Sequence, residues 1–144
     1  MRVTRMEVDL TLALAMCEAA RAAAAEAGAL VSVAVVDGGG HLVSFTRMDA
    51  AEIAGPVLAR DKAYTAVANR CATADLTAEV GPGGEFAGMN SADGGRFIAF
   101  AGGLPLWSEG RVVGGVGVSG GSGAQDAAAA AVAQAVFDAA EATA

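Results

Sequence analysis

The chain has 144 residues, of which 54% are apolar, and a formal net charge of −7 at neutral pH. This length suits a single domain with a substantial core, and no apolar run approaches the roughly 18 residues that a membrane span requires. The excess of acidic residues and the lack of a basic cluster argue against nucleic acid as a partner. We therefore expect one domain over residues 1–144 that binds neither nucleic acid nor membrane.

The first segment predicts a helix followed by a β-hairpin. A capping box formed by Thr4 and Glu7 is expected to begin the helix. The valines of Val31–Val35 and the run His41–Thr46 predict two strands, which a glycine-rich turn at Asp37–Gly40 joins. The helical residues that recur at core-facing spacing are Met6, Leu10, Leu14 and Cys17.

The middle of the chain predicts two helices and a long loop. One helix is expected from Pro56 to about Asn69, and a shorter one, capped by Thr73, runs through Val80. The stretch Gly81–Gly95 carries neither the helical nor the strand period. A loop of this length in a compact domain is usually functional or mobile.

The last part predicts three strands and a helix. The strands are expected at about Arg96–Phe100, Leu104–Ser108 and Arg111–Val118, and a capping box at Ser122 begins a helix over Gly123–Ala142. The whole order, α-β-β-α-α-β-β-β-α, indicates an α/β fold with one antiparallel sheet of about five strands and helices packed on it.

The glycines within the predicted strand Arg111–Val118 admit two interpretations. Gly114, Gly115 and Gly117 weaken a strand, so they indicate close approach of another backbone or of a ligand. A phosphate-binding loop is one explanation, because Gly115–Gly120 matches the pattern GxGxxG. The match lies within the strand and its exit turn and has no lysine nearby, so we prefer close packing of the sheet against helices.

Four segments taken together resemble the GlcG/HbpS-like family, which also includes the C-terminal part of PduO proteins. They are Val35–Ala51, Ala59–Val67, Gly102–Trp107 and Val112–Asp126, and the resemblance covers nearly the whole chain. It implies a profilin-like α/β/α sandwich that commonly assembles into oligomers. Several family members bind haem or are linked to haem degradation and redox sensing. The resemblance therefore implies an oligomeric protein that binds haem or another planar anionic small molecule.

Haem iron needs an axial donor such as His, Cys, Met or Tyr. His41 is the only histidine, so it is the candidate metal ligand, although a hairpin histidine is more often an ordinary surface residue. Met48, Met89, Tyr64 and Cys71 are further donors, but methionine is more often core filler and tyrosine usually packs with its hydroxyl in water. No donor stands out, so haem rests on the family resemblance.

The expected small-molecule pocket lies between the hairpin exit at Arg47–Asp49, the helix that carries Lys62, and the loop Gly81–Gly95. An acidic protein that gathers cations at a concave surface is suited to an anionic ligand. The residues expected to contact the ligand are Arg47, Met48, Tyr64, Asn90 and Trp107.

An alternative function is cofactor-free catalysis on a small metabolite by an isomerase, cyclase or hydratase/lyase type of enzyme. Lys62 lies on a partly apolar helical stripe and is the candidate base or Schiff-base amine; otherwise it forms an ion pair with Asp49 or Asp126. Asp49 and Glu85 are the candidate catalytic carboxylates, and Glu85 is otherwise a solvated loop residue.

A third hypothesis is an oligomeric module that packs through sheet edges and an alanine-rich last helix. That helix places Ala129, Val132, Ala133, Val136 and Phe137 on one apolar face, with Asp126, Asp138 and Glu141 at its rim. We expect the two cysteines to be buried thiols and the protein to be cytoplasmic, because the sequence shows no secretory signal pattern.

Overall fold

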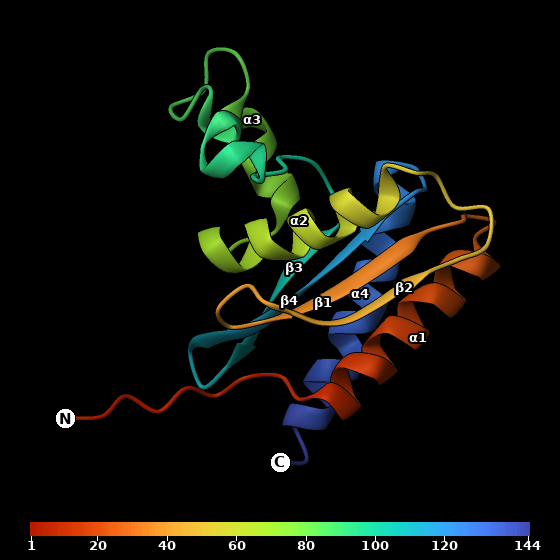
Figure 1. Ribbon diagram of the computed structural model, residues 1–144, viewed down its shortest axis with the longest axis vertical. Helices are drawn as coiled ribbons and strands as arrows, with labels where there is room; N and C mark the ends of the chain where they lie inside the picture. The colour runs from red at the N-terminus through yellow and green to blue at the C-terminus, as the bar shows by residue number, and fades with distance from the viewer.

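A four-stranded antiparallel sheet lies between two layers of helices in the computed structural model, which describes residues 1–144 (Figure 1). The strands lie in the order β2-β1-β4-β3. Their bounds are β1 (Ser32–Asp37), β2 (Leu42–Arg47), β3 (Gly103–Ser108) and β4 (Arg111–Ser119). The α/β class and the antiparallel sheet are confirmed, but the sheet has four strands and not about five.

The helices divide between the two faces of the sheet. Helices α1 (Leu10–Glu26) and α4 (Gly123–Glu141) pack together on one face, and α2 (Gly55–Asn69) crosses the other (Figure 1). Between α2 and β3 the chain forms short turns: η1 (Thr73–Leu76), α3 (Thr77–Val80), η2 (Met89–Ser91) and η3 (Asp93–Gly95). None of the helices combines the length and the hydrophobicity that a membrane span requires.

The glycines of β4 allow α2 to lie directly on the sheet. A Cβ atom at Gly117 would lie 2.0 Å from the carbonyl oxygen of Ala59, and one at Gly115 would lie 2.7 Å from that of Ala63. Both alanines are fully buried on the sheet-facing side of α2. Close helix–sheet packing therefore explains these glycines, and the phosphate-loop interpretation is not needed.

The first helix begins later than the sequence predicts and buries a different face. Asp9 is its N-cap, with Oδ1 accepting a hydrogen bond of 2.8 Å from the Leu12 amide, so the expected capping box is wrong. Leu10 and Leu14 remain 56% and 54% exposed. The buried stripe consists of Ala13, Met16, Cys17, Ala20 and Ala24. Small residues allow α1 to approach α4 closely, so α1 buries its alanine-rich face and leaves the larger leucines exposed.

The segment Arg96–Phe100, expected to be a strand, packs against α2 instead of joining the sheet. The Ile98 amide donates to Thr65 Oγ1 at 2.9 Å, and the Ala99 carbonyl accepts from Thr77 Oγ1 at 2.7 Å. Side-chain hydroxyls thus take the place of a neighbouring strand. Thr73 likewise does not cap a helix, because its Oγ1 accepts from the Gly103 amide at 2.9 Å.

Several other local predictions are confirmed. The hairpin of β1 and β2, helix α2 and the irregular stretch Gly81–Gly95 all form where the sequence places them. The capping box of α4 is present, with Ser122 and Gln125 bonded reciprocally. Asp126 was expected at the rim of α4, but it is buried and only 3% exposed, because it pairs with a buried cation described below.

Candidate functional site

A cavity of about 410 Å³ lies at the end of the sheet where both hairpins turn. The β1–β2 turn supplies Gly38–Gly40, and the β3–β4 hairpin supplies Trp107 and Gly110–Val112. The C-terminal half of α2 forms the remaining wall with Tyr64, Val67, Ala68 and Arg70. The two turns meet because β1 and β4 are antiparallel neighbours, with Asp37 paired to Gly114.

Aromatic and cationic side chains line this cavity beside aliphatic ones and glycines. Tyr64 and the 45%-exposed Trp107 offer ring faces, and Arg70 and Arg111 offer guanidinium groups. No carboxylate lines the cavity, although the chain carries a net charge of −7. Guanidinium forks bind carboxylates in a planar, bidentate manner. The cavity is therefore suited to a planar ligand that carries negative charge.

The glycine turn has its shape because Asp37 holds it and Tyr64 lies beneath it. Oδ1 of Asp37 accepts hydrogen bonds from the amides of Gly39 (2.8 Å) and His41 (3.0 Å). Gly40 has a φ of +82°, and a Cβ atom there would lie 2.7 Å from Cδ2 of Tyr64. Only glycine fits this position, both because of its backbone angle and because the tyrosine ring occupies the adjacent space.

His41 follows the glycine turn and does not line the cavity; its Nδ1 contacts Asp37, and no hydrogen bond occupies its other ring nitrogen. Its side chain is 79% exposed, and Nδ1 lies 3.3 Å from Asp37 Oδ1. A Cβ atom at Gly39, a residue that lines the cavity, would lie 2.9 Å from the His41 ring. A carboxylate on one nitrogen is the usual way to orient a histidine whose other nitrogen binds metal. No group of three or more His, Cys, Asp or Glu side chains is placed to hold a metal ion.

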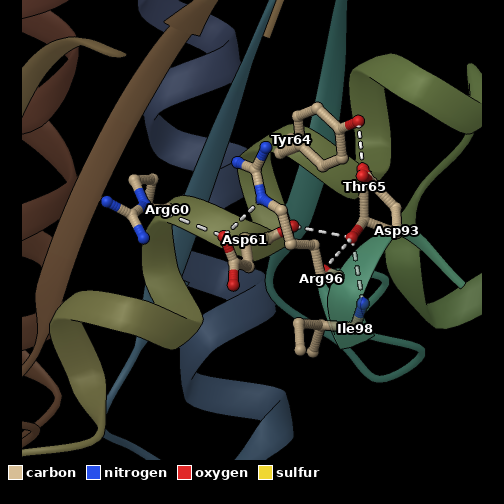
Figure 2. Close-up of polar contacts among 7 residues, drawn as sticks. All are labelled: Arg60, Asp61, Tyr64, Thr65, Asp93, Arg96 and Ile98. Atoms are coloured by element: carbon tan, nitrogen blue, oxygen red, sulfur yellow. Dashed lines mark hydrogen bonds and ion pairs between the residues drawn. The ribbon is translucent and has the colours of Figure 1, made fainter. Parts of the chain in front are cut away.

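Tyr64 lines the cavity and also contacts Asp93, at the end of the irregular stretch (Figure 2). Its hydroxyl hydrogen-bonds to Asp93 Oδ2, and this bond is the main reason why the pKa of Tyr64 is raised above 10.0. The guanidinium of Arg96 lies 3.6 Å from the centre of the tyrosine ring, which is a cation–π contact. The ring of Phe97 stacks with the ring of Tyr64, and the two ring centres are 6.1 Å apart.

Lys62 lines none of the five main cavities. Its side chain is fully buried, and Nζ donates to the Val118 carbonyl at 2.8 Å and to Asp126 Oδ2 at 3.1 Å. The ring of Phe100 lies 4.9 Å from Nζ. Burial lowers the pKa of Lys62, and the charge of Asp126 opposes that shift. Of the alternatives left open by the sequence, the Asp126 ion pair forms; a catalytic role for Lys62 stays a prediction.

The structure does not bring the hairpin exit and the long loop to one cavity. Arg47 and Asp49 are exposed at the opposite end of β2 from the glycine turn, and neither lines any of the main cavities. Met48 packs inward, where its sulfur accepts a hydrogen bond of 3.3 Å from the Val31 amide. Glu85 is exposed, and Asn90 lines a separate cavity beside the α3 turn.

Two residues that line the cavity, Arg70 and Arg111, were not predicted from the sequence. Arg70 ends α2 in the left-handed conformation, and Arg111 follows the tight turn at Glu109–Gly110. The two hairpins could have indicated these residues, because hairpins on neighbouring antiparallel strands can turn at the same end of a sheet. Tyr64 and Trp107, which the sequence analysis did single out, both line the cavity.

Comparisons with known proteins agree on one family. The sequence model of the family described as "Haem degrading protein HbpS-like" matches residues 8–135. An uncharacterised 15.0 kDa protein of Citrobacter freundii, from the dhaT-dhaS intergenic region, is 39% identical over 119 residues, which are 83% of this chain and 84% of that protein. Protein GlcG of Escherichia coli K12 is 34% identical over 116 residues, 81% of this chain and 84% of GlcG.

Solved structures show the same fold. The Klebsiella pneumoniae protein ORFY superposes with a TM-score of 0.93 at 33% identity, covering 96% of this chain and 95% of ORFY. The structure of PduOC in complex with haem superposes with a TM-score of 0.87 at 35% identity, covering 91% of this chain and 95% of PduOC. The similarity therefore extends over the complete sandwich.

Proposed function

Because the chain belongs to the HbpS-like family, we propose that it binds haem, or a planar anionic ligand of closely similar chemistry, in the cavity between the two hairpin turns. The haem complex of PduOC, a structure with the same fold, supports this proposal. The observation that carries it is the combination of two aromatic rings with two arginines and no carboxylate in the cavity lining.

The residues present fit the parts of haem. Arg70 and Arg111 would bind the two propionates through charge-assisted hydrogen bonds, and Tyr64 and Trp107 would contact the ring faces. His41 is the candidate axial donor, because Asp37 engages Nδ1 and leaves Nε2 free. Bound haem would supply one-electron redox chemistry.

A haemin titration followed in the Soret region tests the proposal. We expect Arg70→Met and Arg111→Met each to weaken binding about tenfold or more, since a hydrogen bond to a charged group contributes about 1.5–3 kcal/mol. Arg21→Met is the matched control, because Arg21 lies on α1, does not line the cavity, and forms its ion pair with Glu18. Unchanged binding in both cavity variants would refute the proposed location.

Arg47→Met decides between the two expected positions of the site. The sequence predicts that Arg47 contacts the ligand, whereas the cavity lies at the other end of β2. If the ligand occupies the cavity, Arg47→Met binds haemin as the parent does. His41→Gln is expected to remove the spectral signature of axial ligation while the arginines still hold the porphyrin, so a parental spectrum would assign the axial donor to another residue.

We also infer that the chain forms homo-oligomers. Two sheet edges, β2 and β3, are open, and open edges favour association. Exposed apolar side chains on α1, β2 and α4 support the inference; they are Leu10, Leu14, Phe45 and Val132. Light scattering should give a mass several times the 14.0 kDa of one chain. A monomer at micromolar concentration would refute it.

A further inference from the structure

Tyr64 contacts both the ligand cavity and the segment that contains Asp93 and Arg96. On one side, its ring lines the cavity and lies so close to the glycine turn that a Cβ atom at Gly40 would be 2.7 Å from Cδ2. On the other side, its hydroxyl bonds to Asp93 and its ring carries the guanidinium of Arg96 at 3.6 Å (Figure 2). Neither Asp93 nor Arg96 lines the cavity.

The segment Asp93–Ile98 is held on α2 mainly by side chains. Arg96 Nε donates to Asp61 Oδ1 at 3.2 Å, and Thr65 Oγ1 accepts from the Ile98 amide at 2.9 Å. The backbone hydrogen bonds before this point, from Gly84 to Arg96, all join residues of the Thr77–Arg96 region itself. The docking surface on α2 is therefore one helical face, formed by Asp61, Tyr64 and Thr65.

Of the three docking residues, only Tyr64 also contacts the cavity. A planar ligand in the cavity and the docked segment both require the tyrosine ring to stay in one orientation. Two events that require the same side-chain position stabilise each other, and the coupling is reciprocal. Arg96 also brings a positive charge close to a cavity that is suited to an anion, without contacting the cavity itself.

We propose that Arg96 is a positioning residue for Tyr64, so that docking of the segment Asp93–Ile98 on α2 shapes the ligand cavity, and a planar anionic ligand in turn stabilises the docked segment. The ligand half of this proposal rests on the proposed function. The other half concerns the ligand-free protein, in which Arg96 holds Tyr64 beneath the glycine turn.

Arg60 provides a matched control for Arg96. Both guanidinium groups contact Asp61 Oδ1, Arg60 at 3.7 Å and Arg96 at 3.2 Å, but only Arg96 stacks on Tyr64 (Figure 2). Arg96→Met and Arg60→Met therefore each remove one positive charge and one contact to Asp61. Only Arg96→Met also removes the guanidinium group that stacks on the Tyr64 ring.

Hydrogen–deuterium exchange of the ligand-free protein tests the first half. The amides of Gly39, Gly40 and His41 are hydrogen-bonded within the turn, so their exchange reports its stability. We expect Arg96→Met to accelerate their exchange about fivefold or more, within the usual range of coupling between sites, and Arg60→Met to leave it at the parental rate. Faster exchange confined to Asp93–Ile98, or equal effects of the two variants, would overturn the proposal.

Haemin tests the second half. In the parent, haemin is expected to slow exchange in Asp93–Ile98, and Arg96→Met is expected to weaken haemin binding about fivefold, while Arg60→Met binds it as the parent does. If haemin binds neither the parent nor the variants, the proposed function fails. The exchange measured without ligand still decides the role of Arg96. If haemin binds but leaves Asp93–Ile98 unchanged, the coupling fails and the binding proposal stands.

If Arg96→Met does not fold, Tyr64→Phe provides a second test of the proposal. This variant retains the ring and the stacked guanidinium but removes the hydrogen bond to Asp93. Exchange in Asp93–Ile98 should become faster, and any protection of that segment by haemin should decrease. Parental exchange in the segment would show that the Tyr64 hydroxyl does not hold it and would overturn the proposal.

Discussion

Lys62 and Asp126 form a buried ion pair between the two helical layers, with Nζ and Oδ2 3.1 Å apart. Lys62 belongs to α2 and Asp126 to the first turns of α4, which pack on opposite faces of the sheet. The remaining carboxylate oxygen, Oδ1, accepts from the Gly121 amide at 2.9 Å. The pair therefore joins α2, the end of β4 and α4 at one point.

Lys62→Met should destabilise the fold strongly. Loss of one partner leaves a buried, unpaired charge on Asp126, which costs about 3–5 kcal/mol, or a fall in melting temperature of about 10 °C or more. The double variant Lys62→Met/Asp126→Leu should recover part of this loss, because no buried charge remains. A single variant that melts within a few degrees of the parent would contradict the structural role.

The free energy of unfolding should depend on Lys62 at alkaline pH. Burial lowers the folded-state pKa of Lys62 below 10.5. Between the folded and unfolded pKa values the unfolded chain binds the additional proton, so stability rises with pH through this window and levels off above about 10.5. Denaturant unfolding across the alkaline range, with Lys62→Met as the reference, measures this slope. Parallel curves for the two proteins would refute it.

The titration of Tyr64 should report the Asp93 contact directly. The chain has one tyrosine, so tyrosinate absorbance follows this residue alone. Its midpoint should lie above 10.0, and Asp93→Ala should bring the pKa back toward 10.0, because the Asp93 hydrogen bond is the largest cause of the shift. Glu79→Gln, which removes a carboxylate without contact to Tyr64, is the control and should leave the midpoint unchanged.

Gly117→Ala should test the close approach of α2 to β4. The new Cβ atom would lie 2.0 Å from the backbone oxygen of Ala59, which cannot move without displacing α2. We expect a loss of about 3 kcal/mol or more in the free energy of unfolding. Gly123→Ala is the control, since its nearest neighbour would be 3.7 Å away. Similar stabilities for the two variants would disprove this role of Gly117.

Local patterns alone determined much of this fold. The hairpin of β1 and β2, the bounds of α2 and the capping box of α4 depend on residues that are close in sequence. The glycines of β4 indicated close packing because glycine in a strand interior is costly unless another backbone needs the space. Tyr64 and Trp107 were identified as ligand contacts, and both line the cavity.

Only the tertiary structure decided how distant segments pair. The segment Arg96–Phe100 has strand-like residues, yet Thr65 and Thr77 satisfy its backbone, and no local pattern encodes a hydroxyl 20 or more residues away. Lys62 is a buried ion-pair partner because α4 brings Asp126 to it, 64 residues along the chain. Arg70 and Arg111 became site residues because strand order brings two turns together, and strand order depends on long-range packing that the sequence of either turn does not contain.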